Sequence, residues 1–267
     1  MIEIKRKGSR SIKEIPATIL EQLNRGEIES ANLVEFLGVD RKILLENLLT
    51  QCGRKKYLEP ILTRLDKLEK RTPKTVYETI AMGIYEQIRA HHDSDLLFTI
   101  SRHHSDIVRC WATYIIGKNT ELSVQQMLQA IRPFAADRHF NVREYAWVDV
   151  RKTIVQNLPE SIAILSVWAT DGDENIRRFA SEVTRPRGVW CEHIEILKQN
   201  PELGLPILEP LKSDTSRYVQ NSVGNWLNDA SKTRPEFVRE LCKHWEKESD
   251  TKETQYIIKR ALRTIVK

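Results

Sequence analysis

The sequence predicts an all-α protein in which antiparallel helix pairs repeat along the chain and stack into a solenoid. Three observations lead to this fold class. A short pattern of apolar residues at helical spacing recurs five times from about residue 93 onward. Ten glycines and ten prolines in 267 residues are few for a β-rich chain, which needs many tight turns. A hydrophobic content of 40% and a charged content of 30% are ordinary for a folded protein and wrong for a disordered one.

Each copy of the repeat has an aliphatic anchor and a small apolar residue four positions later. Residues at this spacing share one helix face, so each copy places a narrow apolar stripe against a neighbouring helix. The anchors are Val108, Val142, Ile176, Val219 and Ile257, followed by Ala112, Ala146, Ala180, Val223 and Ala261. The anchor spacings of 34, 34, 43 and 38 residues each accommodate two helices. One helix pair cannot bury its apolar face alone, so the copies must stack.

Each anchor belongs to the second helix of its pair. We expect the turn residue before that helix to cap it, because Asp and Asn side chains accept hydrogen bonds from unpaired first-turn amides. The expected caps are Asp106, Asn141, Asp173, Asp214 and Asp250. The first helices are predicted over residues 93–103, 124–135, 159–170, 201–212 and 235–248. The sequence therefore predicts one HEAT-like solenoid domain over residues 1–267. Residues 1 to about 90 form a helical cap outside the repeat, and residues 93–267 form five helix pairs.

Charge and cysteine content restrict the function classes. The net charge of +5 permits a nucleic-acid partner but does not demand one, so the distribution of charge must carry that argument. The four cysteines lie 51 or more residues apart and form no Cys-x-x-Cys pair, so we expect no metal and no cofactor. No apolar run approaches the ~18 residues that a membrane span requires, and we expect a cytoplasmic protein.

Two carboxylates are placed beside the predicted core stripe of two successive second helices. Glu182 lies six residues after the anchor Ile176, and Asp229 lies ten residues after Val219. At ~100° per residue both fall on the same side of equivalent helices, so they can converge in one groove. The alternative is that both are solvated helix charges, paired with Arg185 and Lys232 three residues further on.

Basic residues surround the first of these carboxylates. Four arginines occur within eleven residues, and Lys232 follows Asp229 at a distance of three residues. Arginine presents a planar, permanently charged fork that suits phosphate oxygens, so we expect this set to bind DNA. The set consists of Arg177, Arg178, Arg185, Arg187 and Lys232. Trp190 follows closely and could stack on a nucleobase.

Two motifs in this region resemble those of a known family. The first is Ser181-Glu182-x-x-Arg185-Pro186-Arg187-x-x-Trp190. The second is Ser222-Val223-x-Asn225-x-Leu227-Asn228-Asp229-x-Ser231-Lys232-x-x-Pro235. Together they resemble the AlkC branch of the AlkC/AlkD HEAT-like DNA glycosylases, over roughly residues 141–267. Gly188-Val189 replaces the usual Leu-Pro before the tryptophan of the first motif. We also expect that the 267 residues leave no room for the immunoglobulin-like C-terminal domain that many members carry.

The resemblance implies a monomeric, monofunctional glycosylase. It would hydrolyse the N-glycosidic bond of cationic alkylated bases, such as 3-methyladenine, in duplex DNA. It would place Glu182, Asp229 and Trp190 in the active site, with a third carboxylate one repeat earlier that is either Glu144 or Asp149. The competing function class is a non-catalytic HEAT-repeat scaffold that binds nucleic acid or protein. That scaffold predicts the same solenoid but has no use for carboxylates in its groove.

Overall fold

The protein is all-helical over the residues that the structure describes. The computed structural model describes residues 6–189 and 191–265, and no β-strand occurs in these two ranges. The chain divides into two compact units. Unit 1 comprises Met1–Lys118 and Arg138–Ala146, and unit 2 comprises Asn119–Asp137 and Trp147–Lys267. The expected single domain over residues 1–267 stays a prediction, and each unit is described by itself.

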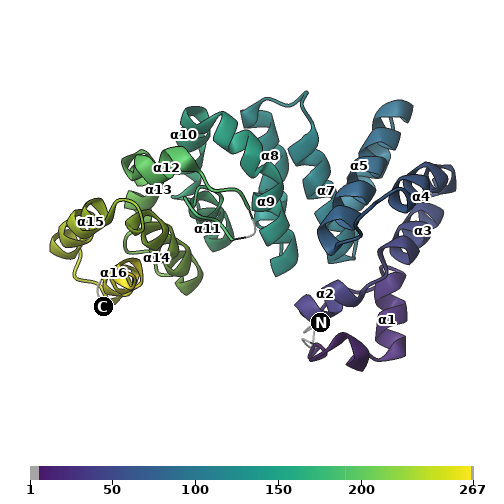
Figure 1. Ribbon diagram of the computed structural model, residues 1–267, viewed down its shortest axis with the longest axis horizontal. Coiled ribbons are helices and arrows are strands. Elements are labelled where there is room, and N and C mark those ends of the chain that lie inside the picture. Colours follow the sequence, from purple (N-terminus) through teal and green to yellow (C-terminus); the bar gives the residue numbers. More distant parts are fainter. Residues whose placement is uncertain (1–5, 190, 266–267) are drawn as a thin grey trace. The chain divides into compact units, whose positions relative to one another are not determined.

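Unit 1 contains seven complete described helices in chain order (Figure 1). They are α1 (Ala17–Asn24), α2 (Leu33–Gly38), α3 (Arg41–Gln51), α4 (Leu58–Asp66), α5 (Pro73–His91), α6 (Ser94–Ser101) and α7 (Asp106–Lys118). The long helix α5 begins at a proline and is capped by a reciprocal side-chain box between Thr72 and Thr75. It packs against α4 on one side and α7 on the other. A helix pair therefore already exists before residue 93, in the region that the repeat pattern did not reach.

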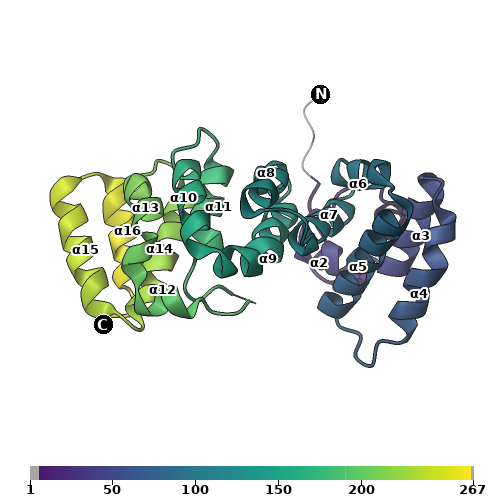
Figure 2. The ribbon, with the colours of Figure 1, turned by 90° about the horizontal axis from the view of Figure 1, so that it is seen from above.

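Unit 2 carries the remaining helices, shown from two directions in Figures 1 and 2. They are α8 (Val124–Ala135), α10 (Leu158–Trp168), α11 (Glu174–Val183), α12 (Glu195–Gln199), α13 (Leu205–Leu208), α14 (Arg217–Ser231), α15 (Pro235–Glu248) and α16 (Lys252–Leu262). Helix α9 (Phe140–Gln156) contributes residues to both units. Helix α14 packs against both α11 and α16, so three second helices of the repeat lie in succession.

The five anchors occupy the positions that the repeat predicts. Val108, Val142, Ile176, Val219 and Ile257 lie in α7, α9, α11, α14 and α16 and are 0–1% exposed. The small residues beside them allow close helix packing, and Gly224 of α14 shows how close it is. A Cβ atom at Gly224 would lie 2.6 Å from Cβ of Arg260 in α16. The predicted stacking of helix pairs is therefore confirmed within unit 2.

One predicted first helix is broken. Residues 201–212 form a 3₁₀ turn (Pro201–Gly204), the single turn α13 and a second 3₁₀ turn (Glu209–Leu211). Pro201, Pro206 and Pro210 remove backbone donors within ten residues, which interrupts the α-helical bonding. Gly204 brings this segment against the buried Trp226, whose ring would lie 2.5 Å from an added Cβ atom. The other four predicted first helices correspond to α6, α8, α10 and α15.

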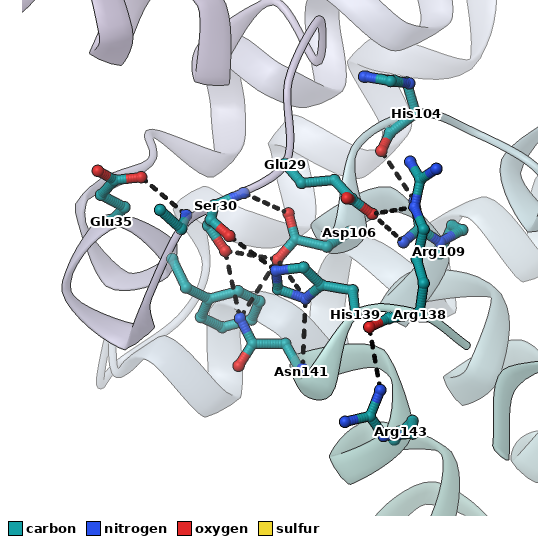
Figure 3. A network of polar contacts seen from close by, with 12 residues as sticks. Glu29, Ser30, Glu35, His104, Asp106, Arg109, Arg138, His139, Asn141 and Arg143 are labelled. Atoms are coloured by element: carbon teal, nitrogen blue, oxygen red, sulfur yellow. Dashed lines mark hydrogen bonds and ion pairs between the residues drawn. The ribbon is translucent and has the colours of Figure 1, made fainter. Parts of the chain in front are cut away.

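Four of the five predicted helix caps are wrong. Only Asp173 caps its helix, by accepting from the Asn175 amide. Ser216 and Thr251 cap α14 and α16 in place of Asp214 and Asp250. Asp106 and Asn141 lie inside the first turns of α7 and α9. In unit 1 both bind Ser30, whose amide and hydroxyl donate to Asp106 at 3.0 and 2.6 Å, as Figure 3 shows.

A side chain next to each of the first four anchors holds the turn between the two helices of its pair. Arg109 donates to the carbonyls of His103 and His104 at 2.8 Å, and Arg143 donates to that of Arg138 at 3.0 Å. In unit 2, Arg177 donates to the Asp171 carbonyl at 2.9 Å and Gln220 to the Asp214 carbonyl at 2.7 Å. We call Arg109, Arg143, Arg177 and Gln220 the turn-holding residues. The arginine or glutamine beside each of these anchors is thus a structural part of the repeat.

Candidate active site

Two carboxylates of unit 2 meet at one guanidinium group. Glu182 lies near the end of α11, Asp229 lies in α14, and Arg185 lies in the turn after α11. Arg185 donates from Nη1 to Glu182 Oε1 at 2.8 Å and from Nε to Asp229 Oδ2 at 2.9 Å. Its Nη2 atom lies 2.8 Å from the same Asp229 oxygen. The structure therefore brings Glu182 and Asp229 within the span of a single side-chain head group, as their helical positions predicted.

This cluster is nearly closed to solvent. Glu182 is 4% exposed, Asp229 3% and Arg185 8%. The second oxygen of Glu182 accepts from the Ser222 hydroxyl at 2.7 Å and lies 3.6 Å from Nη2 of Arg178. Burial opposes ionisation of Glu182, yet the Arg178 and Arg185 charges and the Ser222 hydroxyl outweigh it and hold its pKa below the ordinary value. Glu182 is therefore an ionised carboxylate at neutral pH.

A second buried arginine holds the loop that follows α11. Arg151 of α9 is 4% exposed and belongs to unit 2. It donates to the carbonyls of Val183 and Arg185 at 2.5 Å and to that of Glu192 at 3.3 and 3.4 Å. These carbonyls lie at both ends of the loop between α11 and α12, so Arg151 closes the loop and fixes the backbone of Arg185. The prediction did not include Arg151, and its partners are backbone atoms that no motif records.

The middle of this loop packs tightly against Arg151. A Cβ atom at Gly188 would lie 2.4 Å from Sγ of Cys191 and 3.3 Å from Nη2 of Arg151. The glycine that replaces the usual leucine of the resembled motif therefore permits a close approach to the buried arginine. Burial raises the pKa of the Cys191 thiol. Trp190, the predicted aromatic residue of the site, lies outside the described residues.

The predicted basic residues have different environments. Arg177 binds Asp214 through Nε at 2.6 Å and Nη2 at 3.1 Å, in addition to its turn carbonyls, so it has a structural role, and its DNA contact stays a prediction. Arg185 is held by the carboxylates. Arg178 stacks on the ring of Tyr218, with 4.2 Å between its Cζ atom and the ring centroid. Lys232 is 42% exposed at its side chain, and its Nζ atom lies 3.5 Å from Asp229 Oδ1.

Arg187 and the two candidates for a third carboxylate complete the predicted set. Arg187 is half-buried, and its Nε atom is buried without a hydrogen-bond partner among the described residues. Glu144 and Asp149 are both half-buried on α9, in unit 1 and unit 2 respectively. The residue after Asp149, Val150, is 0% exposed and belongs to the core. The choice between Glu144 and Asp149 stays a prediction.

A basic and aromatic surface on α14 and α16 was missed. Arg217 stacks on the ring of Tyr256 with 3.6 Å between Cζ and the centroid. The Tyr256 hydroxyl donates to Asn221 at 2.8 Å, and Arg260 donates to Asn225 at 2.9 Å. Burial acts to raise the pKa of Tyr256, but Arg260 and Arg217 outweigh it and lower this pKa. A signal existed in the sequence, because Tyr218 and Tyr256 both directly precede an anchor.

The fold and the site together define a HEAT-like helical-repeat protein with a paired-carboxylate centre. Residues 146–265 match the family model described as DNA alkylation repair enzyme. A Bacillus subtilis (strain 168) protein named as the uncharacterized protein YhaZ is 38% identical over 139 residues, which are 52% of this chain and 38% of YhaZ. Residues 146–265 of this chain are therefore similar to DNA alkylation repair enzymes.

Solved structures support the same fold. The alkylpurine DNA glycosylase AlkC of Pseudomonas fluorescens, bound to DNA containing an abasic site analog, superposes with a TM-score of 0.65 at 22% identity. That match covers 97% of this chain and 66% of AlkC. AlkD2 from Streptococcus mutans superposes with a TM-score of 0.61 at 23% identity, over 82% of this chain and 100% of AlkD2. The chain thus spans about two thirds of the AlkC chain and less than half of YhaZ. No helix among the described residues is long and apolar enough to cross a membrane.

Proposed function

We propose that this protein is a DNA glycosylase that hydrolyses the N-glycosidic bond of cationic alkylated bases, such as 3-methyladenine, in duplex DNA. The observation that carries the proposal is the convergence of Glu182 and Asp229 on Arg185. The family match over residues 146–265 and the fold shared with AlkC, a glycosylase, support it. A monomeric state and a cytoplasmic location stay predictions.

The chemistry needs stabilisation of positive charge more than it needs an acid. An alkylated base with a fixed positive charge leaves with the electron pair of its bond to C1′ and becomes neutral. The sugar then carries the positive charge in an oxocarbenium-like transition state. A carboxylate near this charge lowers the barrier, and water adds its oxygen to C1′ while its proton passes to a carboxylate or to solvent. Glu182 and Asp229 are the residues that we assign to this role.

The decisive experiment measures release of 3-methyladenine from methylated duplex DNA under single-turnover conditions. Glu182→Gln and Asp229→Asn should each lower the rate about 10²–10³-fold, the loss typical of one preorganised electrostatic group, roughly 2.7–4 kcal/mol. The double variant should lose less than the sum, because both groups act on one charge. Glu195→Gln is the matched control, since Glu195 is an exposed carboxylate of unit 2 that pairs with its neighbours Lys198 and Gln199.

The alternative is a non-catalytic scaffold that binds DNA, and the near-complete burial of the carboxylate cluster favours it. A scaffold would bind duplex DNA with a log affinity that falls with the logarithm of the salt concentration, at a slope of about −0.9 per phosphate neutralised. It would release no base from methylated DNA. If the wild-type protein releases bases and the double variant releases them at the same rate, Glu182 and Asp229 do not have the proposed role.

A further inference from the structure

Arg185 occupies the position that the proposed chemistry requires for a cation. Its guanidinium group lies between the two carboxylates and hydrogen bonds to both, at 2.8 and 2.9 Å. The group is planar, and its positive charge is spread over three nitrogen atoms. An alkylated base or an oxocarbenium-like sugar is likewise a flat cation with a spread charge. A cation of this kind that entered the site would compete with Arg185 for the same carboxylate oxygens.

The remaining partners of the carboxylates cannot replace Arg185. Ser222 supplies one neutral hydrogen bond to Glu182, and Arg178 lies 3.6 Å from it. Lys232 lies 3.5 Å from Asp229. Both carboxylates are more than nine-tenths buried, and a buried charge that loses its close partner is strongly destabilised. A ligand that displaces Arg185 must therefore bring a positive charge of its own.

We propose that Arg185 is a specificity-determining residue that keeps the carboxylate pair neutralised until a cationic ligand displaces its guanidinium group. The inference rests on the proposed function and adds the reason for its selectivity. A neutral nucleotide leaves Arg185 in place, because displacing it would leave two buried carboxylates with only the longer charged contacts of Arg178 and Lys232. A cationic nucleotide exchanges one ion pair for another, so only it gains access to the carboxylates.

The backbone of Arg185 is held by contacts that do not involve its own side chain. Arg151 binds the Arg185 carbonyl at 2.5 Å, and Pro186 follows directly in the chain. In the proposed exchange the guanidinium therefore moves by rotation about its side-chain bonds while the backbone stays fixed. A phosphate group of the bound DNA is a suitable new partner, since arginine binds phosphate oxygens through the same two-pronged geometry.

The test compares binding of two duplexes by fluorescence anisotropy at pH 8. One contains a neutral tetrahydrofuran in place of one nucleoside, and the other contains a pyrrolidine that is protonated at this pH. The wild-type protein should prefer the cationic duplex. Arg185→Gln should increase this preference about tenfold or more, because the internal competitor is gone. Arg217→Gln removes an exposed arginine of the same unit and should weaken binding of both duplexes equally.

Arg185→Lys provides the variant that keeps a charge if Arg185→Gln does not fold. An ammonium group is a compact charge that cannot bridge both carboxylates, so the preference should lie between those of the wild type and Arg185→Gln. An unchanged or reduced preference in either variant would overturn the inference. If the wild-type protein releases methylated bases but the variants show no gain, only the inference about Arg185 fails. If it neither releases bases nor prefers the cationic duplex, the proposed function itself fails.

Discussion

The loop after α11 should lose its closure when Arg151 is replaced. Arg151→Met keeps most of the buried volume but removes every donor that holds the carbonyls of Val183, Arg185 and Glu192. Arg151→Lys keeps the charge but can reach fewer of these carbonyls at once. The two variants therefore separate the effect of the charge from the effect of the multiple hydrogen bonds.

The structure gives the size of the effect. A hydrogen bond to a charged group contributes about 1.5–3 kcal/mol. The two bonds at 2.5 Å should carry most of the stabilisation, and the two longer ones to Glu192 should add little. We therefore expect Arg151→Met to lower the free energy of opening this loop by about 3–5 kcal/mol. Arg151→Lys should lower it by about half as much.

Amide hydrogen exchange at Ile194 measures this opening directly. The Ile194 amide donates to the Pro186 carbonyl at 2.9 Å, so its protection reports closure of the loop. Arg151→Met should also move the acidic limb of the activity profile to higher pH, because a mobile Arg185 stabilises the charged form of Glu182 less. Lys152→Met, which removes the exposed neighbouring cation, is the control. Unchanged protection of Ile194 in Arg151→Met would refute the reasoning.

Three further predictions concern other parts of unit 2. Asp214→Asn should lower the free energy of unfolding, measured by urea denaturation, by about 2 kcal/mol, because Arg177 loses a charged partner at 2.6 Å. An unchanged denaturation midpoint would show that this ion pair does not stabilise the fold. Gly224→Ala should lower the free energy of unfolding by about 1–3 kcal/mol despite the higher helix propensity of alanine, because the new Cβ would lie 2.6 Å from Arg260 Cβ. A stabilised variant would contradict this packing. The lowered pKa of Glu182 means that its contribution to stability is complete above about pH 4.5 and is lost as pH falls below that value. In thermal unfolding, the melting temperature should fall less between pH 7 and pH 3 in Glu182→Gln than in the wild type. Equal decreases in both proteins would contradict this.

The second helices of the repeat could be predicted because an apolar stripe fixes which face is buried. The helix pair α4 and α5 could not, because its close contact uses a different pattern. Gly83 of α5 meets Ile61 of α4, with 2.8 Å between an added Cβ atom and the isoleucine, and no small residue follows Ile80 at the fourth position. The prediction of Asp106 as a helix cap was wrong for a related reason. Its partner Ser30 lies 76 residues earlier in the chain, where no local rule can find it.

The site shows the same division between local and long-range information. The helical positions of Glu182 and Asp229 predicted that the two carboxylates converge. The sequence also offered Arg185 and Lys232 as local partners three residues away, and both contacts exist. The bridge from Arg185 to Asp229 spans 44 residues and joins the two local pairs into one cluster. No spacing rule within a single helix predicts that bridge.

The turn-holding residues have a consequence for how such a chain can diverge. Each of these side chains binds backbone oxygen atoms, which every amino acid supplies, so the turn itself is free to change its composition. Because each of the first four turns is held by its own side chain, one interval can lengthen without disturbing the next. The interval from Ile176 to Val219 is 43 residues against 34 for each of the two before it, and the added length includes the loop that carries Arg185. A modular framework of this kind lets a loop be inserted and refined while the helices around it keep their packing.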